Sequence, residues 1–157
     1  QDEGKSTQLF ALTESWRQFA ENLTAVTAVG GGDYPEDVNN GLYQAVAHMN
    51  WQPEATKLLI LLGDAPPQQS TPGTPTLEEI TAIAAERSII IYSIGSDGLD
   101  ERGMAIFQQI AEWNSGRFYY LTDMPEYGPS AATAVYATTD LPSLLVHIVT
   151  ETPADIR

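Results

Sequence analysis

Two apolar runs constrain the fold of this chain more than any other feature. Leu58–Leu62 lies within "KLLILLGDAPP", and Ile89–Ile94 lies within "SIIIYSIG". Neither run alternates between apolar and polar residues, and the second is rich in β-branched side chains, which favour strands. A strand that is apolar on both faces needs cover on both faces, as in a parallel sheet between two layers of helices. We therefore predict two buried strands of an α/β fold.

Segments with apolar residues at helical spacing alternate with these runs. A first helix is expected from Thr13 to the glycine run at Gly30–Gly32, and a second starts with a capping box at Asp33–Glu36 and extends to Met49. A third helix starts with a capping box at Thr76–Glu79, and a fourth is capped by Asp100 and closed at Asn114–Gly116. A strand over residues 117–122, a loop over residues 124–140 and a helix over residues 141–151 follow. This alternation implies right-handed crossovers and a parallel sheet with helices on both faces. Trp16, Trp51 and Trp113 are expected in the core or between helices. Residues 1–157 are predicted to form a single domain.

The charge balance limits the possible partners. The chain has 7 Lys and Arg residues against 21 Asp and Glu residues, a net charge of −14 at pH 7. This excess repels nucleic acids and anionic membranes and favours cations. No stretch approaches the roughly 20 apolar residues of a membrane-spanning helix. Cysteine is absent, which excludes thiolate metal ligands. We therefore expect no nucleic-acid partner and no membrane insertion.

Two aspartates are the candidate metal ligands. Asp64 directly follows the first apolar run, so it is expected at the carboxyl end of a strand, where parallel sheets bind their ligands. Asp33 lies in "GGGDYPED", where the glycines allow close approach of the backbone to a ligand. Two carboxylates without a basic neighbour attract a hard cation such as Mg²⁺, Ca²⁺ or Mn²⁺. The alternatives are that Asp64 is a turn residue and that Asp33 only caps a helix.

A longer stretch carries a family resemblance. "GGGDYPEDVNNGLYQAVAHMNWQPEATKLLILLGDAPP" resembles the von Willebrand factor type A domain, in the bacterial style with a G-G-G-D-x-P-E loop. The later "IAAERSIIIYSIG" and "FQQIAEWNSGRFYYLTD" resemble the next helix and strand units of that family. The resemblance implies a doubly wound, Rossmann-like α/β fold and a metal-ion-dependent adhesion site, at which a carboxylate of a protein ligand completes the coordination of a divalent cation. In this resemblance Asp33 matches the middle motif and Asp64 the last.

The first motif of the family, D-x-S-x-S, does not occur in the sequence. Its nearest counterpart, Asp2–Ser6, reads D-E-G-K-S and follows no apolar strand. The resemblance therefore covers about the C-terminal two thirds of the family domain and lacks its N-terminal strands. In the family the first strand lies beside the one that matches Leu58–Leu62, so this strand is left with an unpaired apolar edge. We expect a preceding segment or a separate chain to complete the sheet, and only weak cation binding by this chain alone.

The resemblance implies a non-enzymatic protein-binding or adhesion module, extracytoplasmic or secreted, that depends on a divalent cation. One alternative is a structural subunit of an extracellular filament or surface assembly, in which a neighbour pairs with the edge strand. Another is a metal-assisted hydrolase that uses the acids at the carboxyl edge of the sheet.

Overall fold

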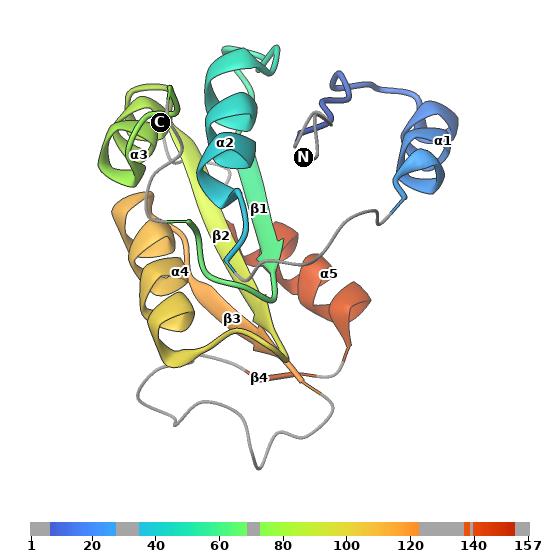
Figure 1. Cartoon of the computed structure of the whole chain (residues 1–157). Helices are drawn as coiled ribbons and strands as arrows, with labels where there is room; N and C mark the ends of the chain where they lie inside the picture. The colour runs from blue at the N-terminus through green and yellow to red at the C-terminus, as the bar shows by residue number, and fades with distance from the viewer. Residues whose placement is uncertain (1–6, 28–34, 69–72, 123–136, 139, 153–157) are drawn as a thin grey trace.

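A computed structural model describes residues 7–27, 35–68, 73–122, 137–138 and 140–152. In chain order the elements are α1 (Trp16–Ala25), α2 (Val38–Tyr43), the π-helix η1 (Gln44–His48), β1 (Lys57–Gly63), α3 (Leu77–Glu86), β2 (Ile89–Ser96), α4 (Glu101–Trp113), β3 (Phe118–Leu121), β4 (Ala137–Thr138) and α5 (Leu141–Glu151), as Figure 1 shows. The described strands form one sheet in the order β1-β2-β3-β4, and each neighbouring pair is parallel. The predicted α/β class with a parallel sheet is confirmed.

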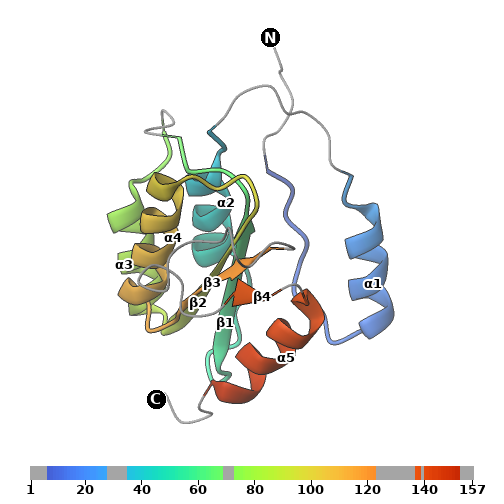
Figure 2. The same ribbon diagram turned by 90° about the horizontal axis from the view of Figure 1, so that it is seen from below.

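Helices cover both faces of the sheet. Figure 2 shows α2, α3 and α4 on one side of the strands and α5 on the other. Alternate residues of β2 divide between these sides, because successive side chains of a strand point to opposite faces. Ile89 and Ile91 join the core under α3 and α4, whereas Ile90 and Ile94 join the core under α5. β2 is therefore buried on both faces, as its sequence predicts.

The outer face of β1 differs from the prediction. Ile60 is 37% exposed and Leu62 is 51% exposed, so the expected cover on both faces is wrong for this strand. The core under α5 includes Leu58 of β1 but otherwise draws on β2 and β3 among the strands. Among the described strands, β1 pairs only with β2 and lies at the edge of the sheet. An apolar edge strand was expected here, and β1 has no second strand partner among the described residues.

Two helix starts lie where the sequence predicts them. Thr76 and Glu79 form a reciprocal capping box: the Glu79 N–H donates to the Thr76 hydroxyl at 3.3 Å, and the Thr76 N–H donates to the Glu79 carboxylate at 2.8 Å. Asp100 accepts a 2.7 Å hydrogen bond from the N–H of Gly103 at the start of α4. These caps satisfy backbone donors that helix starts leave free.

The first two helices start later than predicted. α1 begins at Trp16 with Ser15 as its cap, not at Thr13, and it ends at Ala25, before the glycine run. α2 begins at Val38, so the proposed Asp33–Glu36 capping box is wrong as the start of this helix. The reason is tertiary, because the backbone of Glu36 pairs with the loop that follows β1.

An arginine that is distant in the sequence binds the end of the helix formed by α2 and η1. α2 continues into η1, whose last carbonyls have no partner within the helix. The Arg87 guanidinium, just after α3, donates to the carbonyls of Val46 and Ala47 at 2.9 and 3.0 Å. This pair of charge-assisted bonds joins the ends of η1 and α3.

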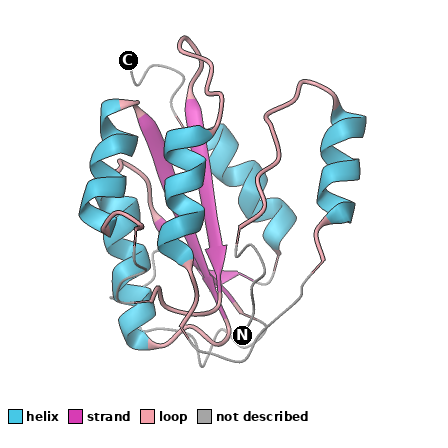
Figure 3. Cartoon of the chain, turned by 45° about the horizontal axis from the view of Figure 1, so that its top comes forward, coloured by secondary structure: helices cyan, strands magenta, loops and turns pink. Residues whose placement is uncertain are grey.

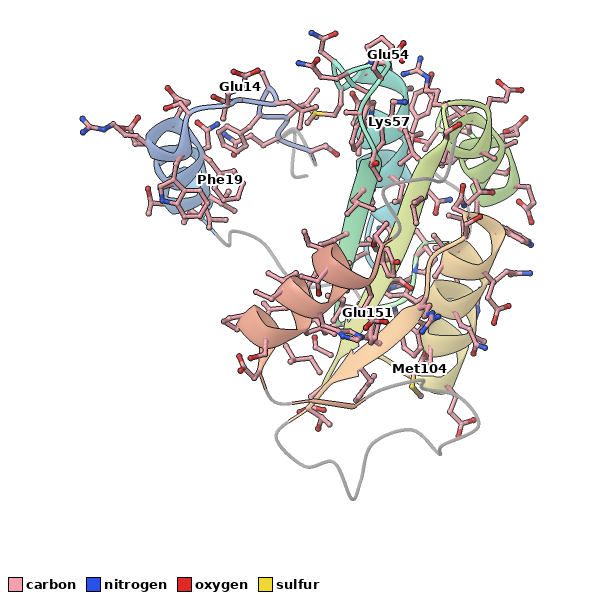
Figure 4. The ribbon with its side chains drawn as sticks, turned by 180° about the vertical axis from the view of Figure 1, so that it is seen from behind. Glu14, Phe19, Glu54, Lys57, Met104 and Glu151 are labelled. Atoms are coloured by element: carbon pink, nitrogen blue, oxygen red, sulfur yellow. The ribbon has the colours of Figure 1, made fainter. Side chains whose placement is uncertain are left out.

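α1 stands apart from the sheet. Figures 2 and 3 show it separated from the strands by the arm of residues 7–14, and it has no buried residue. Phe19 lies on the side of α1 that faces the rest of the molecule (Figure 4). Trp16 is 78% exposed and stacks on Phe19 at 5.5 Å between ring centroids, so its predicted core position is wrong.

The other two tryptophans divide. Trp51 packs against the core and donates a 2.9 Å hydrogen bond to the Ala45 carbonyl, as expected of a packing residue. Trp113, at the end of α4, is 42% exposed, so a core position is wrong for it, but it lines a hollow with residues of α3 and so lies between helices.

The stretch predicted as a loop over residues 124–140 contains a short strand. Most of that stretch is outside the described residues, but Ala137 and Thr138 pair in parallel with Tyr120 and Leu121. Two residues are too few for a periodic signal, so only pairing with β3 reveals β4.

Within the described part of the chain, no helix has the length and apolar character needed to cross a membrane.

Candidate functional site at the carboxyl edge of the sheet

Two loops are joined by backbone hydrogen bonds beyond the carboxyl end of β1. The N–H of Glu36 donates to the Pro66 carbonyl at 3.0 Å, and the N–H of Gln68 donates to the Glu36 carbonyl at 2.9 Å. The Gln68 side chain donates to the Pro35 carbonyl at 3.2 Å. The segment that leads into α2 therefore runs alongside the loop that follows β1. Figure 1 shows the start of α2 near the arrowhead of β1.

The loop after β2 lies against the same place. Gly98 has a φ of +119°, and a Cβ added there would lie 3.0 Å from the backbone oxygen of Asp64. Both facts favour glycine, because other residues rarely adopt this conformation and a side chain would crowd the Asp64 backbone. The turn is closed by a 3.0 Å hydrogen bond from the Leu99 N–H to the Ser96 carbonyl. Three loops thus meet at this edge, which we call the rim: residues 35–37, 64–68 and 96–100.

Asp64 is at the rim, as its sequence position predicts. It directly follows β1 and is exposed, so its carboxylate is accessible to solvent. Asp33 lies outside the described residues, and the structure neither places it nor tests it as a ligand. Pro35, two positions further along the chain, belongs to the rim. The structure therefore locates one of the two predicted ligands and the near neighbour of the other.

The rim contains other acids besides Asp64. Asp37, just before α2, accepts a 3.2 Å hydrogen bond from the Asn40 side-chain amide. Asn40 also donates to the Thr7 hydroxyl at 2.8 Å, which joins the N-terminal arm to the start of α2. Burial raises the pKa of the Tyr120 hydroxyl, and the negative charge of Asp97 raises that pKa further. The field of Asp97 therefore extends from the loop after β2 to the end of β3.

The described residues do not form a complete metal centre. In the part of the chain that the structure describes, no three His, Asp or Glu side chains cluster in a way that could hold a metal ion. Asp64 can supply the hard carboxylate oxygen that Mg²⁺, Ca²⁺ and Mn²⁺ prefer, but such ions need several oxygen ligands. Any cation here would need further ligands from Asp33, from water or from another chain.

A cavity of about 450 Å³ adjoins the rim, and the sequence interpretation did not anticipate it. It lies between the loop at Pro67, the start of α3 and one side of α4. The signal for it in the sequence is a mixed helical stripe, since Arg102, Ile106, Gln109 and Trp113 recur at spacings of three and four. Arg102 and Gln109 are polar members of this stripe, so it indicates a partly open face.

Part of the chain is similar in sequence to a known protein. No family model matches the chain. A stretch of 57 residues, 36% of the chain, is 35% identical to part of "Alpha-protein kinase vwkA" of Dictyostelium discoideum. The chain spans only 9% of the length of that protein, so the similarity is local to a small part of it.

Proposed function

We propose that this chain is a non-enzymatic protein-binding module of the von Willebrand factor type A kind, which holds a protein ligand through a divalent cation at the rim. Asp64 and Asp33 would be the metal ligands, or hydrogen-bond partners of the water that completes the coordination. The ligand would contribute a carboxylate. An acidic, extracytoplasmic or secreted module of this kind would acquire Mg²⁺, Ca²⁺ or Mn²⁺ from its surroundings.

The observation that carries this proposal is the joining of the segment after Asp33 to the loop after Asp64. Glu36 follows Asp33 by three positions, and its backbone is bonded on both sides to the Asp64 loop. Because only two residues separate Asp33 from Glu36, this pairing supports a position of the Asp33 carboxylate close to that of Asp64. Carboxyl ends of parallel strands are also where sheets of this type bind ligands.

The edge of β1 supports the expectation that another segment completes the site. A strand of 7 residues with exposed Ile60 and Leu62 is a favourable partner for a further strand. A strand that paired there in parallel would end beside Asp64. It could supply the Asp and Ser oxygens of the D-x-S-x-S motif, which the sequence lacks.

Binding of Mn²⁺ by the intact protein, followed by electron paramagnetic resonance, tests the proposal. The Asp64→Ala and Asp33→Ala variants should each lose the bound Mn²⁺ signal. Glu54→Ala is the matched control, because Glu54 is an exposed acid before β1, at the opposite end of the strand (Figure 4). Equal Mn²⁺ affinity in the wild type and in Asp64→Ala would refute the cation site.

A structural subunit of a surface assembly is a second candidate, and the exposed side of β1 is the observation that favours it. Pairing with the strand of another copy would bury Ile60 and Leu62 without any cation. Sedimentation velocity over a range of concentrations distinguishes the two. Assembly that persists in EDTA and is abolished by Leu62→Lys would support the structural role, since a lysine on an edge strand opposes pairing.

A further inference from the structure

The cavity beside the rim is part of a longer groove between α3 and α4. A second hollow of about 240 Å³ adjoins it, and the two share the side chains of Glu78 and Trp113. We define the α3–α4 groove as these two hollows together. One wall is the start of α3, and the other is the stripe of α4 from Arg102 to Trp113. Asp64, the one predicted metal ligand among the described residues, does not line the groove.

We propose that the α3–α4 groove binds an extended peptide that carries an acidic side chain and a basic side chain about five residues apart. The acidic side chain would pair with Arg102, and the basic one would lie against Trp113 and Glu78. This peptide site needs no cation, and it is separate from the cation-dependent site proposed at the rim.

A buried acceptor without a donor indicates that a ligand belongs in the groove. Asn39 lines the groove and is only 8% exposed, yet its Oδ1 accepts no hydrogen bond. Buried polar atoms are nearly always hydrogen-bonded, because an unpaired one loses its bonds to water without replacement. A peptide N–H that reached Asn39 would restore the missing bond.

The charges at Arg102, in the first hollow, and at Glu78, where the two hollows meet, set the polarity of the ligand. Arg102 makes no hydrogen bond or ion pair with any residue that the structure describes. Its guanidinium can therefore bind a carboxylate through two parallel hydrogen bonds, in bidentate geometry. Glu78 is exposed on the first turn of α3 and lies near Trp113 in both hollows. An aromatic face next to a carboxylate is a favourable place for a lysine or arginine side chain.

The stretch of the groove between Arg102 and Trp113 sets the spacing of the two charges. Arg102 and Trp113 are 11 residues apart on one helix, which corresponds to about 16 Å at 1.5 Å per residue. An extended peptide covers that distance in about five residues. Gln109 lies between the two ends and can both donate to and accept from a peptide backbone.

The opposite charges of Arg102 and Glu78 favour a peptide over a nucleic acid or a neutral sugar. A nucleic acid would bring its phosphates to a chain with a net charge of −14 and would meet Glu78 where the two hollows join. A neutral sugar would leave Arg102 and Glu78 without charged partners. A peptide with both signs of charge satisfies each end.

Selection of random heptapeptides displayed on phage, against the immobilised intact protein in EDTA, tests the proposal. Enriched sequences should carry an acidic and a basic residue about five positions apart. A fluorescein-labelled enriched peptide, measured by fluorescence anisotropy, should bind at least tenfold more weakly to Arg102→Glu and to Trp113→Ala. Asn39→Ala should weaken binding without lowering the stability of the protein, because it removes an acceptor that the protein itself does not use.

Matched variants outside the groove control for non-specific effects. Arg117→Glu makes the same charge change, and Trp16→Ala removes another exposed tryptophan; both should bind the peptide as the wild type does. The proposal is overturned if no peptide is enriched over a blank surface, or if enriched peptides lack the charge spacing. It is also overturned if the affinity is the same in Arg102→Glu and Trp113→Ala as in the wild type. Because the selection contains EDTA, loss of the cation site by Asp64→Ala leaves the expected result unchanged.

Discussion

Substitution of Gly116 by alanine should be among the most damaging single changes in this chain. Gly116 lies between the end of α4 and the start of β3, and a Cβ added there would lie 1.9 Å from the carbonyl oxygen of Ile91. Ile91 is fully buried in β2, and the Gly116 N–H is bonded to the Ala111 carbonyl at 3.0 Å, so both backbones resist displacement. Ordinary contact between such atoms needs about 3.5 Å, so the two segments would have to separate by about 1.5 Å.

That separation breaks the hydrogen bonds that start the pairing of β2 with β3. The Ile91 N–H donates to the Asn114 carbonyl at 3.4 Å, and the Ser93 N–H donates to the Arg117 carbonyl at 3.1 Å. Each lost bond costs about 1 kcal/mol, and a buried group left unpaired costs about 1–3 kcal/mol. We therefore expect Gly116→Ala to lower the free energy of unfolding by about 3–5 kcal/mol. For a domain of this size that corresponds to a fall in Tm of about 10 °C.

Urea unfolding followed by circular dichroism, with a thermal melt in parallel, measures the effect. Gly41→Ala is the matched control, because Gly41 is exposed within α2 and a Cβ added there meets nothing within 4 Å. The control should be stabilised by about 0.5–1 kcal/mol, since alanine favours a helix interior more than glycine does. A loss below about 1 kcal/mol in Gly116→Ala would refute the reasoning, because the predicted clash would then be relieved without breaking the sheet.

Three further changes probe other parts of the fold. Ser115 has a φ of 60° at the end of α4, so Ser115→Gly should raise the free energy of unfolding by about 1 kcal/mol; no gain in urea unfolding would contradict this. Gly98→Ala should lower stability by about 1–3 kcal/mol and weaken Mn²⁺ binding, because it strains the loop that lies against Asp64; unchanged stability would show that the loop adapts freely. Burial raises the pKa of Tyr119, and the neighbouring Tyr92 raises it further, so the unfolded chain releases that proton first. Stability should therefore fall as pH rises above about 10, and less steeply in Tyr119→Phe, when urea unfolding is repeated between about pH 8 and 11; equal slopes would contradict the assignment.

The elements that could be predicted depend on residues close together in the sequence. The Thr76–Glu79 capping box and the Asp100 cap involve bonds across three positions, and both appear as predicted. The pleat of β3 also follows from local geometry, since Tyr119 and Tyr120 join opposite cores. Patterns of this range carry their own physical cause, so they can be recognised without knowledge of the rest of the chain.

The errors arose where distant segments decide the outcome. The Asp33–Glu36 pattern has the residues of a capping box, but Glu36 pairs its backbone with Pro66 and Gln68 instead. Trp16 has the spacing of a core residue, but α1 does not pack on the sheet. The local sequence signal was present in both cases. A competing tertiary contact changed the outcome for Glu36, and the lack of a packing partner changed it for Trp16.

The sequence alone determined the class of the fold, the position of Asp64 after a strand and the acidic character of the chain. The fold class and the position of Asp64 follow from hydrophobic runs and helix caps, which are patterns of a few neighbouring residues. The acidic character follows from the net charge, which is a sum over the charged residues. Only the tertiary structure decided that the loops around Pro35, Asp64 and Gly98 meet, that β1 is left at an edge, and that α3 and α4 enclose a groove. The physical reason is that burial and pairing depend on what lies opposite a residue in space, and residues distant along the chain supply that neighbour.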